Sequence, residues 1–550
     1  MIRRAALSPT VALPLLVIAL AIAQRIAALS YGLPDVYYSD EDRVIESALY
    51  TLTGDLDPHL VKYPHLLVNL FAMAFRVHEG IWLGADPERI ARVLVRYQES
   101  PFRITLLARW IGLVLDLIAV PVTFLIGRRL WGSREGWIAA ALLVLSPLHM
   151  DLSRVARVDA PAATFTVLSI LFALRFVESG RARDVFVAGL AGGAGAGCKY
   201  YPVIVGIAAL LLVRERGGPL RSQAGVAVLF GASAIAAFAL SSPALVLDLR
   251  SFLTELPKLT ASHYNTPFWA ERGRATLGHE FVPLVRYTVG FAGWACLLVF
   301  AFSTIRERAK RRVELIAVLA YPATLLAFFL RSETFFLRFL VSALPFLCLG
   351  AARGATLLAS HSAGDVRRPA LRVSVVSVAL LIALTPFVWD AADTALWTIT
   401  PRDTRLQARR WIEKNVPDNT PLVLPFRRLS PYFPSRKVPF PHPPTELWER
   451  IANYSPRYGE PLRASFTAGS EAATRGKRQV VYAGVDPAEG LRRLGPDAVV
   501  AVSLEELSAP DTEARARSID SFARTHRRAA SFSGKWIESF GPPIEIWVPR

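Results

Sequence analysis

Long apolar stretches separated by short polar ones run through the first 390 residues. They lie at 10–30, 104–128, 134–149, 158–178, 184–198, 200–214, 222–247, 284–305, 313–331, 335–353 and 371–390. A helix needs about 20 apolar residues to cross roughly 30 Å of hydrocarbon. Most of these stretches reach or approach that length, although 134–149, 184–198 and 200–214 are short. The pattern predicts a polytopic α-helical membrane protein with about eleven transmembrane helices.

One further apolar stretch, 64–84, is ambiguous because it contains Asn69, Arg76 and His78. Basic residues favour the cytoplasmic side of a membrane. If 64–84 does not cross, residues 31–103 form one external loop, and five arginine-rich connections alternate onto the inside. If it crosses, all five move outside. We therefore expect 64–84 to lie on the outer membrane face as an amphipathic juxtamembrane helix, and the N-terminus to be cytoplasmic.

The chain becomes more polar after residue 390, and the same alternation places this tail outside. LQARRWIEKNV (406–416) has helical periodicity, whereas VVYAGV, DAVVAVS and IEIWVP are typical of buried strands. We predict a transmembrane domain at 1–390 and an extracytoplasmic α/β domain at 391–550.

Composition supports membrane insertion and argues against nucleic-acid binding. The chain is 53% hydrophobic, and its net charge of +18 comes from arginines in the short connections between apolar stretches. Such loops attract anionic lipid headgroups and form no separate basic patch. The opening MIRR and first apolar stretch are interpreted as an uncleaved helix rather than a signal peptide. Cys198, Cys296 and Cys348 lie in apolar stretches and suit small packing residues. The small residues of GLAGGAGAG predict close helix packing.

Charged residues gather on the predicted outer face. Asp40, Glu41 and Asp42 follow the first apolar stretch, where carboxylates are costly unless they have partners or a function. Other connections add charged or polar groups to the same side of the membrane: His149, Asp151, Arg154, Arg157, Asp159, Lys199, Glu333 and Arg338. A solvated loop or an acidic helix start is the alternative interpretation of the triplet.

This combination suits group transfer from a phosphate-bearing lipid. A carboxylate can accept the proton of an acceptor hydroxyl, while Lys or Arg stabilises the departing phosphate. Acids and histidines also bind hard divalent ions, but no spacing here matches a defined metal motif, so a divalent metal ion stays an open alternative.

Several motifs resemble GT-C membrane glycosyltransferases, in the bacterial branch related to protein O-mannosyltransferases and to the lipid A aminoarabinose transferase. The resemblance is carried by YYSDED with GDLDPH and KYPHLL, SPLHMDLSRVARVDAPAATF, GAGCKYYPVI and LRFLVSALPFL. QARRWIEKNVPDNTPLV is similar to the external C-terminal domains of some members. The motif YPHL departs from the pattern, because many relatives have a second proline there.

The resemblance implies an inverting glycosyltransferase that moves a sugar from a polyprenyl-phosphate donor to a lipid, glycan or protein acceptor outside the cytoplasm, in the bacterial plasma (inner) membrane. The implied catalytic residues are Asp40, Glu41 and Asp159, which would also be the ligands of a metal if one is present. The implied substrate-binding residues are Asp42, His59, Lys62, Tyr63, His149, Lys199, Tyr200 and Arg338.

Alternatives remain at the level of residues and of function. Asp42 competes with Asp40 for the role of general base, both Asp40 and Asp159 suit a helix start, and Lys199 suits an interfacial lysine that extends toward water. A multispan transporter or lipid flippase is the alternative function, and a membrane scaffold is a third. A transporter would place its ionisable groups near the bilayer midplane in repeated halves, which this sequence does not show.

Overall fold

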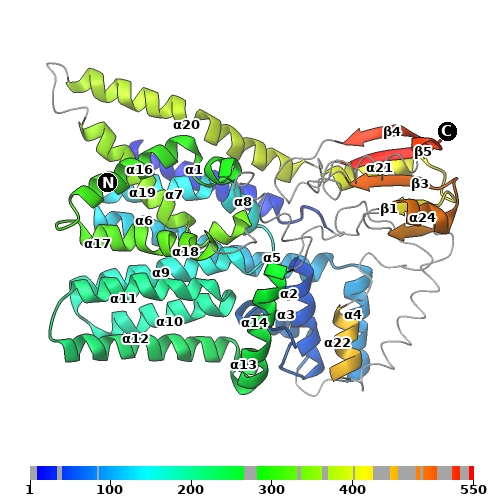
Figure 1. The fold of residues 1–550 in the computed structure, drawn as a ribbon, viewed down its shortest axis with the longest axis horizontal. Helices are drawn as coiled ribbons and strands as arrows, with labels where there is room; N and C mark the ends of the chain where they lie inside the picture. Colours follow the sequence, from blue (N-terminus) through cyan, green and yellow to red (C-terminus); the bar gives the residue numbers. More distant parts are fainter. Residues whose placement is uncertain are drawn as a thin grey trace, which may run out of the picture. The chain divides into compact units, whose positions relative to one another are not determined.

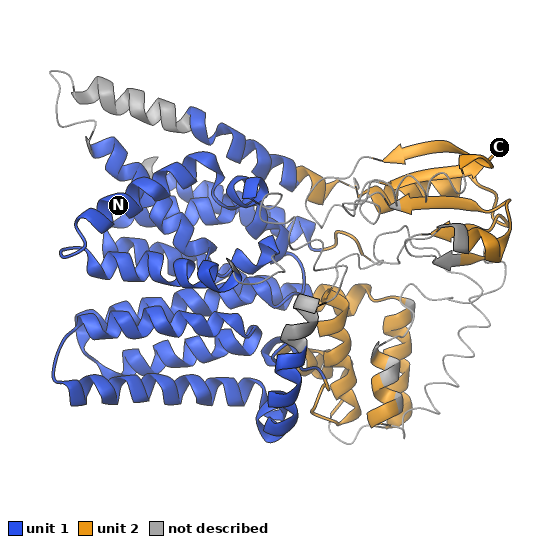
Figure 2. Cartoon of the chain, viewed as in Figure 1, with its two compact units in different colours: residues 1–29, 60–69, 109–395 blue, residues 30–59, 70–108, 396–550 orange. Residues whose placement is uncertain are grey.

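The computed structural model describes residues 9–33, 40–82, 86–265, 281–330, 336–361, 369–400, 403–424, 446–455, 479–482, 487–503, 523–532 and 544–550. The chain divides into two compact units (Figure 2). The first comprises residues 1–29, 60–69 and 109–395, and the second comprises 30–59, 70–108 and 396–550. The first unit is helical, and the second combines helices with a sheet (Figure 1). The predicted domains, 1–390 and 391–550, stay predictions.

Each of the eleven predicted apolar stretches contains helix in the structure. The helices are α1 (Pro9–Ala28), α5 (Phe102–Leu117), α6 (Ala119–Leu130), α7 (Ser133–Leu145), α9 (Asp159–Ser179), α10 (Ala182–Cys198), α11 (Val205–Glu215), α12 (Leu220–Ser241), α16 (Gly290–Arg306), α17 (Arg312–Leu315), α18 (Tyr321–Leu330), α19 (Leu344–His361) and α20 (Pro369–Ile399). By length and composition, four helical segments of the described chain are long and apolar enough to cross a membrane, or six when two bent pairs are each counted as one span. These helices fit a polytopic membrane protein.

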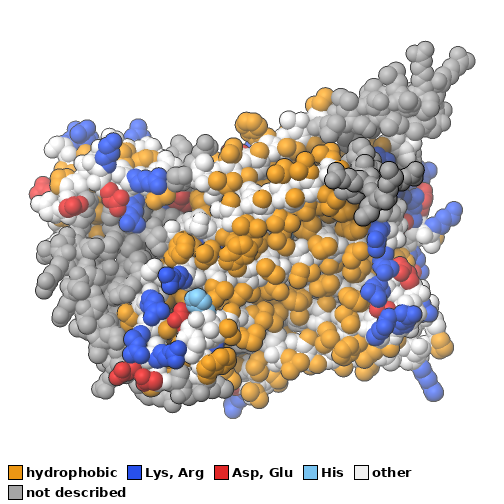
Figure 3. Space-filling model, turned by 180° about the vertical axis from the view of Figure 1, so that it is seen from behind, with side chains coloured by type: hydrophobic (Ala, Val, Ile, Leu, Met, Phe, Trp, Pro, Cys, Tyr) orange, Lys and Arg blue, Asp and Glu red, His pale blue; other side chains and the backbone are white. Residues whose placement is uncertain are grey.

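Figure 3 shows one face of the molecule in a space-filling view. Hydrophobic side chains cover a broad, nearly continuous area, and Lys and Arg side chains gather at its margins. Leu13, Leu20 and Phe302 are among the large hydrophobic side chains that are more than half exposed. A surface of this kind is stable in hydrocarbon and would associate in water.

Glycines bring α10 close to α12. Gly189, Gly193 and Gly197 recur every fourth residue and so lie on one face of α10. A Cβ atom at Gly193 would meet the backbone of Ala234 in α12, and one at Gly197 would meet the side chain of Ser241. The predicted close packing of this segment is confirmed. The three cysteines are buried and unpaired, as predicted.

The ambiguous stretch 64–84 contains one helix, α3 (Leu66–Glu79), of 14 residues. At 1.5 Å per residue it extends about 21 Å, which is short of the hydrocarbon thickness. Phe71 and Phe75 are buried on one face, whereas Met73 and Val77 are exposed on the other. The helix therefore does not reach spanning length, and its exposed face carries apolar side chains, so its position as an amphipathic helix on the outer membrane face stays a prediction.

The second unit contains a five-stranded sheet with strand order β2-β1-β3-β5-β4. Its strands are β1 (Leu422–Leu424), β2 (Val480–Tyr482), β3 (Val499–Ser503), β4 (His526–Phe532) and β5 (Ile544–Pro549). Strand β1 pairs in parallel with β2 and β3, whereas β5 pairs antiparallel with β3 and β4. The three predicted strand segments are β2, β3 and β5.

Alternation along the strands sends apolar side chains to both faces of this sheet. Leu422 and Leu424 pack on one face against Ile412 of α21 (Thr404–Asn415). Val423 and Val500 lie in a second apolar cluster, which Leu491 of α24 (Pro487–Leu494) joins. The tail therefore folds around a sheet that is covered on both faces, as α/β architecture requires.

Candidate active site

The acidic triplet begins the helix α2 (Glu41–Tyr50). Asp40 occupies the N-cap position, but its side chain makes no capping hydrogen bond. Its φ of 73° lies in the left-handed region, which residues other than glycine adopt only at a cost of about 1–3 kcal/mol. The carboxylate is 3.8 Å from the guanidinium of Arg43, and the residue is 9% exposed. A conventional helix cap is thus not what Asp40 provides.

The two following acids have different surroundings. Glu41 is the first residue of α2 and is buried. Asp42 is half-buried, and its carboxylate accepts a hydrogen bond from the backbone N–H of Arg43. The roles of Asp40, Glu41 and Asp42 stay predictions, and so does the choice between Asp40 and Asp42 as the base.

Lys199 and Asp159 form an ion pair in the first unit. Lys199 caps the C-terminus of α10 with an extended backbone, and Asp159 is the first residue of α9. The ammonium contacts the carboxylate directly, and the two side chains are only 12% and 5% exposed. Removal from water strengthens an ion pair and makes each partner costly without the other. Each residue therefore holds the other, and the catalytic role of Asp159 and the substrate-binding role of Lys199 stay predictions.

Aromatic rings surround the lysine of this pair. The Lys199 ammonium lies 4.6 Å from the ring centroid of Phe339 and 5.1 Å from that of Tyr201. Arg338 lies 5.7 Å from the same Phe339 ring, so two cations share one aromatic side chain. Cation–π contacts of this kind attract an ammonium electrostatically to the ring face. The structure therefore brings together Asp159, Lys199 and Arg338 from three separate segments.

Tyr200 connects the lysine segment to residues 60–63. Its hydroxyl donates to the backbone carbonyl of Val61 at 2.6 Å. The next residue, Lys62, is half-buried with its ammonium 5.5 Å from the ring of Tyr63, which is buried. Residues 60–63 and the Lys199 segment thus belong to one compact unit.

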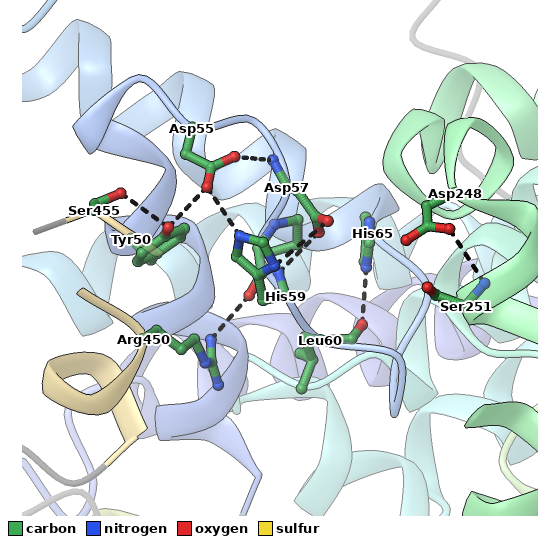
Figure 4. Close-up of polar contacts among 11 residues, drawn as sticks. Tyr50, Asp55, Asp57, His59, Leu60, His65, Asp248, Ser251, Arg450 and Ser455 are labelled. Atoms are coloured by element: carbon green, nitrogen blue, oxygen red, sulfur yellow. Dashed lines mark hydrogen bonds and ion pairs between the residues drawn. The ribbon is translucent and has the colours of Figure 1, made fainter. Parts of the chain in front are cut away.

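His59 belongs to a different cluster in the second unit (Figure 4). Its Nε2 lies 2.9 Å from Oδ2 of Asp55, which also accepts a hydrogen bond from the hydroxyl of Tyr50 at 2.8 Å. Burial acts to raise the pKa of Asp55, but hydrogen bonds from His59, Tyr50 and the backbone of Asp57 outweigh it and leave the pKa lowered. Burial raises the pKa of Tyr50. The imidazole stacks on the ring of Tyr454, with centroids 3.6 Å apart.

His149 is fully buried in an ionic network. Its Nδ1 lies 2.8 Å from the guanidinium of Arg25, and its Nε2 lies 3.1 Å from the carboxylate of Asp116. Arg25 also donates to the carbonyl of Val144 and the hydroxyl of Ser153, at the bend between α7 and α8 (Pro147–Ser153). This network orients the segment that leads to Asp159. A substrate contact by His149 stays a prediction, and it would require displacing Arg25 or Asp116.

The sequence alone did not identify several of these partners. Arg25, Asp116 and Phe339 were not selected. Arg25 and Asp116 did carry a signal, because an ionisable residue inside an apolar stretch is costly unless it has a partner. The sequence KYYP, which places a cation beside two aromatic residues, was the one available signal for Tyr201. Glu333, which was also considered, lies outside the described residues.

A divalent metal ion was the open alternative at this site. No three His, Cys, Asp or Glu side chains lie close enough together in the described ranges to hold a metal ion. Asp159, one of the three proposed ligands, is instead paired with Lys199. Asp40 and Glu41 belong to the second unit and Asp159 to the first, so a divalent metal ion stays an open alternative.

Comparison with protein families identifies residues 105–246 as similar to the family described as dolichyl-phosphate-mannose-protein mannosyltransferase. This segment contains Asp159, Lys199, His149 and Tyr200. The match confirms the predicted resemblance to protein O-mannosyltransferases. No curated protein matches the chain by sequence.

Three solved structures resemble the chain. ArnT from Cupriavidus metallidurans, bound to undecaprenyl phosphate, is 15% identical, with 97% of each chain covered and a TM-score of 0.46. The oligosaccharyltransferase from Archaeoglobus fulgidus, in complex with zinc and sulfate, is 14% identical, with 84% of this chain and 70% of that one covered and a TM-score of 0.46. AglB from the same archaeon, with an inhibitory peptide and a dolichol-phosphate, is 13% identical, with 95% and 73% covered and a TM-score of 0.46. Scores this low do not establish a shared fold.

Proposed function

We propose that this chain is a GT-C glycosyltransferase that moves a sugar from a polyprenyl-phosphate donor to an acceptor outside the cytoplasm. The observation that carries the proposal is the buried Asp159–Lys199 pair, which lies within the segment that matches the mannosyltransferase family and has Arg338 beside it. A scaffold role would not explain a lysine that is removed from water and placed between aromatic rings at the end of a helix.

Lys199 and Arg338 would hold the phosphate of the donor. An ammonium has three N–H donors, so Lys199 can keep its contact with Asp159 and still donate to a phosphate oxygen. Asp159 then acts as a positioning residue, because it fixes the ammonium. A nearby arginine adds a second, planar set of donors to the phosphate oxygens.

Asp40 would act as the general base of an inverting transfer. The acceptor oxygen bonds to the anomeric carbon from the face opposite the phosphate, and the bond from that carbon to the phosphate oxygen breaks. Its electron pair leaves on the phosphate, where Lys199 and Arg338 stabilise the charge, and the acceptor proton passes to Asp40. No step uses a metal ion. Under this proposal the chain lies in a bacterial plasma membrane, with the N-terminus cytoplasmic and residues 391–550 outside.

The experiment is a transfer assay with a panel of labelled polyprenyl-phosphate sugars. Membranes containing the protein should transfer label to a lipid, glycan or protein, and Asp40→Asn should abolish transfer without changing insertion or donor binding. Wild-type turnover by purified Asp40→Asn would overturn the assignment of the base. Movement of the labelled lipid between leaflets without any transfer of sugar would favour the flippase alternative.

A further inference from the structure

The second unit joins the first external loop to the tail of the sequence at several defined contacts. Arg450 of α22 (Glu446–Tyr454) donates to the hydroxyl of Ser47 at 2.6 Å and lies 3.4 Å from the carbonyl of Pro58. It is a buried arginine at 8% exposure. An arginine that is removed from water has to be held by several acceptors, and both of these come from the loop.

Two neighbours of Arg450 add to the same junction. The hydroxyl of Ser455 lies 2.9 Å from the hydroxyl of Tyr50, which donates in turn to Asp55. The ring of Tyr454 stacks on His59 at an interplanar angle of 8°. Residues 450–455 therefore contact both α2 and the turn that follows it.

A further contact lies on the other side of the acidic triplet. The hydroxyl of Tyr31 donates to the carboxylate of Asp403 at 3.1 Å. Asp403 is itself fixed as the N-cap of α21 and by its pairing with Arg405. In sequence, Asp40 lies between Tyr31 and Ser47, so the tail holds the loop both before and after the proposed base.

Backbone geometry shows what these contacts maintain. Among the described residues, only Asp40 and His59 have positive φ without being glycine, at 73° and 48°. Unfavourable conformations persist only where the surrounding structure determines them by other contacts. For His59 these contacts include the Tyr454 stack. For Asp40 a chain of contacts runs from Arg450 through Ser47, whose hydroxyl donates to the carbonyl of Arg43, to the Arg43–Asp40 ion pair.

We propose that Asp403, Arg450, Tyr454 and Ser455 form a C-terminal clasp that holds the first external loop in its catalytic conformation. The residues of the clasp touch no reacting atom and act as positioning residues through α2. This inference rests on the proposed function for its effect on turnover, whereas the effect on α2 itself is independent of any activity.

Hydrogen exchange of residues 40–50 in the purified full-length protein tests whether the clasp stabilises α2. Arg450→Ala and Tyr31→Phe should each accelerate exchange of α2, and Arg450→Lys should restore part of the protection because it keeps a donor for Ser47. Arg410→Ala is the matched control, since Arg410 is an exposed arginine of α21 in the same unit. Unchanged exchange of α2 in both Arg450→Ala and Tyr31→Phe would overturn the clasp.

Steady-state transfer kinetics test whether the clasp also affects turnover. Arg450→Ala should lower kcat by about 10–100-fold, the loss expected from misplacing a catalytic group by about 1 Å, with little change in the KM for the donor. Adding Ser47→Ala should lower kcat no further, because the two side chains act through one contact. A fall in folded protein with kcat per folded molecule unchanged would mean a merely structural role and would overturn the proposal. If wild-type protein transfers no sugar but exchange of α2 still responds to Arg450→Ala, the proposed function fails and the clasp stands.

Discussion

Replacing Lys199 by methionine separates the structural and catalytic contributions of the buried ion pair. Methionine keeps the length and apolar stem of lysine but leaves the Asp159 carboxylate, which is 5% exposed, without its cation. Removing one partner of a buried pair costs about 3–5 kcal/mol. An effective dielectric constant near 20 gives about 4 kcal/mol for two charges roughly 4 Å apart, which is the same size. We therefore expect Lys199→Met to lower the thermal unfolding midpoint clearly in detergent or nanodiscs.

The double variant Lys199→Met/Asp159→Asn removes both charges and should recover most of that stability. Transfer should not recover, because the phosphate has lost its ammonium. A loss of roughly 10²–10³-fold in kcat is typical of removing one donor that stabilises developing negative charge. Wild-type turnover in the double variant would refute the role of Lys199, and an unchanged unfolding midpoint in Lys199→Met would refute the energetic argument.

Three further predictions concern packing, topology and acid stability. Gly193→Leu should destabilise the α10–α12 contact by about 1–3 kcal/mol in thermal unfolding, whereas Gly225→Leu, at a glycine with no neighbour within 4 Å, should not. In intact cells a cysteine at Ser100 should react with an impermeant thiol reagent and one at Ser133 should not; reversed labelling would contradict the proposed orientation. Because the pKa of Asp55 is lower in the folded than in the unfolded chain, its stabilising contribution is complete above about pH 4 and is lost as the pH falls through the folded pKa. Unfolding midpoints should thus fall less in acid for Asp55→Asn, and an equal fall in both proteins would exclude this contribution.

The sequence predicted the parts of the fold that depend on local composition. Apolar length located the helices, small residues at Gly189, Gly193 and Gly197 predicted a close helix contact, and valine-rich segments marked three of the five strands. Strand β4 was missed because HRRAASF is polar and pairs at the sheet edge with β5 alone among the described strands, so it shows no buried pattern.

Contacts between distant segments were less accessible. Asp159 and Lys199 were both selected, but their pairing depends on how the start of α9 lies against the end of α10, which no local pattern specifies. Arg450 was not selected at all, because one arginine in an amphipathic helix is indistinguishable from a solvated one until its acceptors, Ser47 and Pro58, are known. Contacts between loops that are far apart in sequence depend on tertiary structure, and local patterns in a single sequence do not predict them.

The left-handed backbone of Asp40 sets stability and activity against each other at a single position. Glycine adopts a φ of 73° without steric penalty, so Asp40→Gly would relieve backbone strain and raise the free energy of unfolding. Under the proposed function that protein would be inert, because the carboxylate that takes the acceptor proton would be gone. A stability screen of this protein would therefore favour the substitution that a transfer assay should reject.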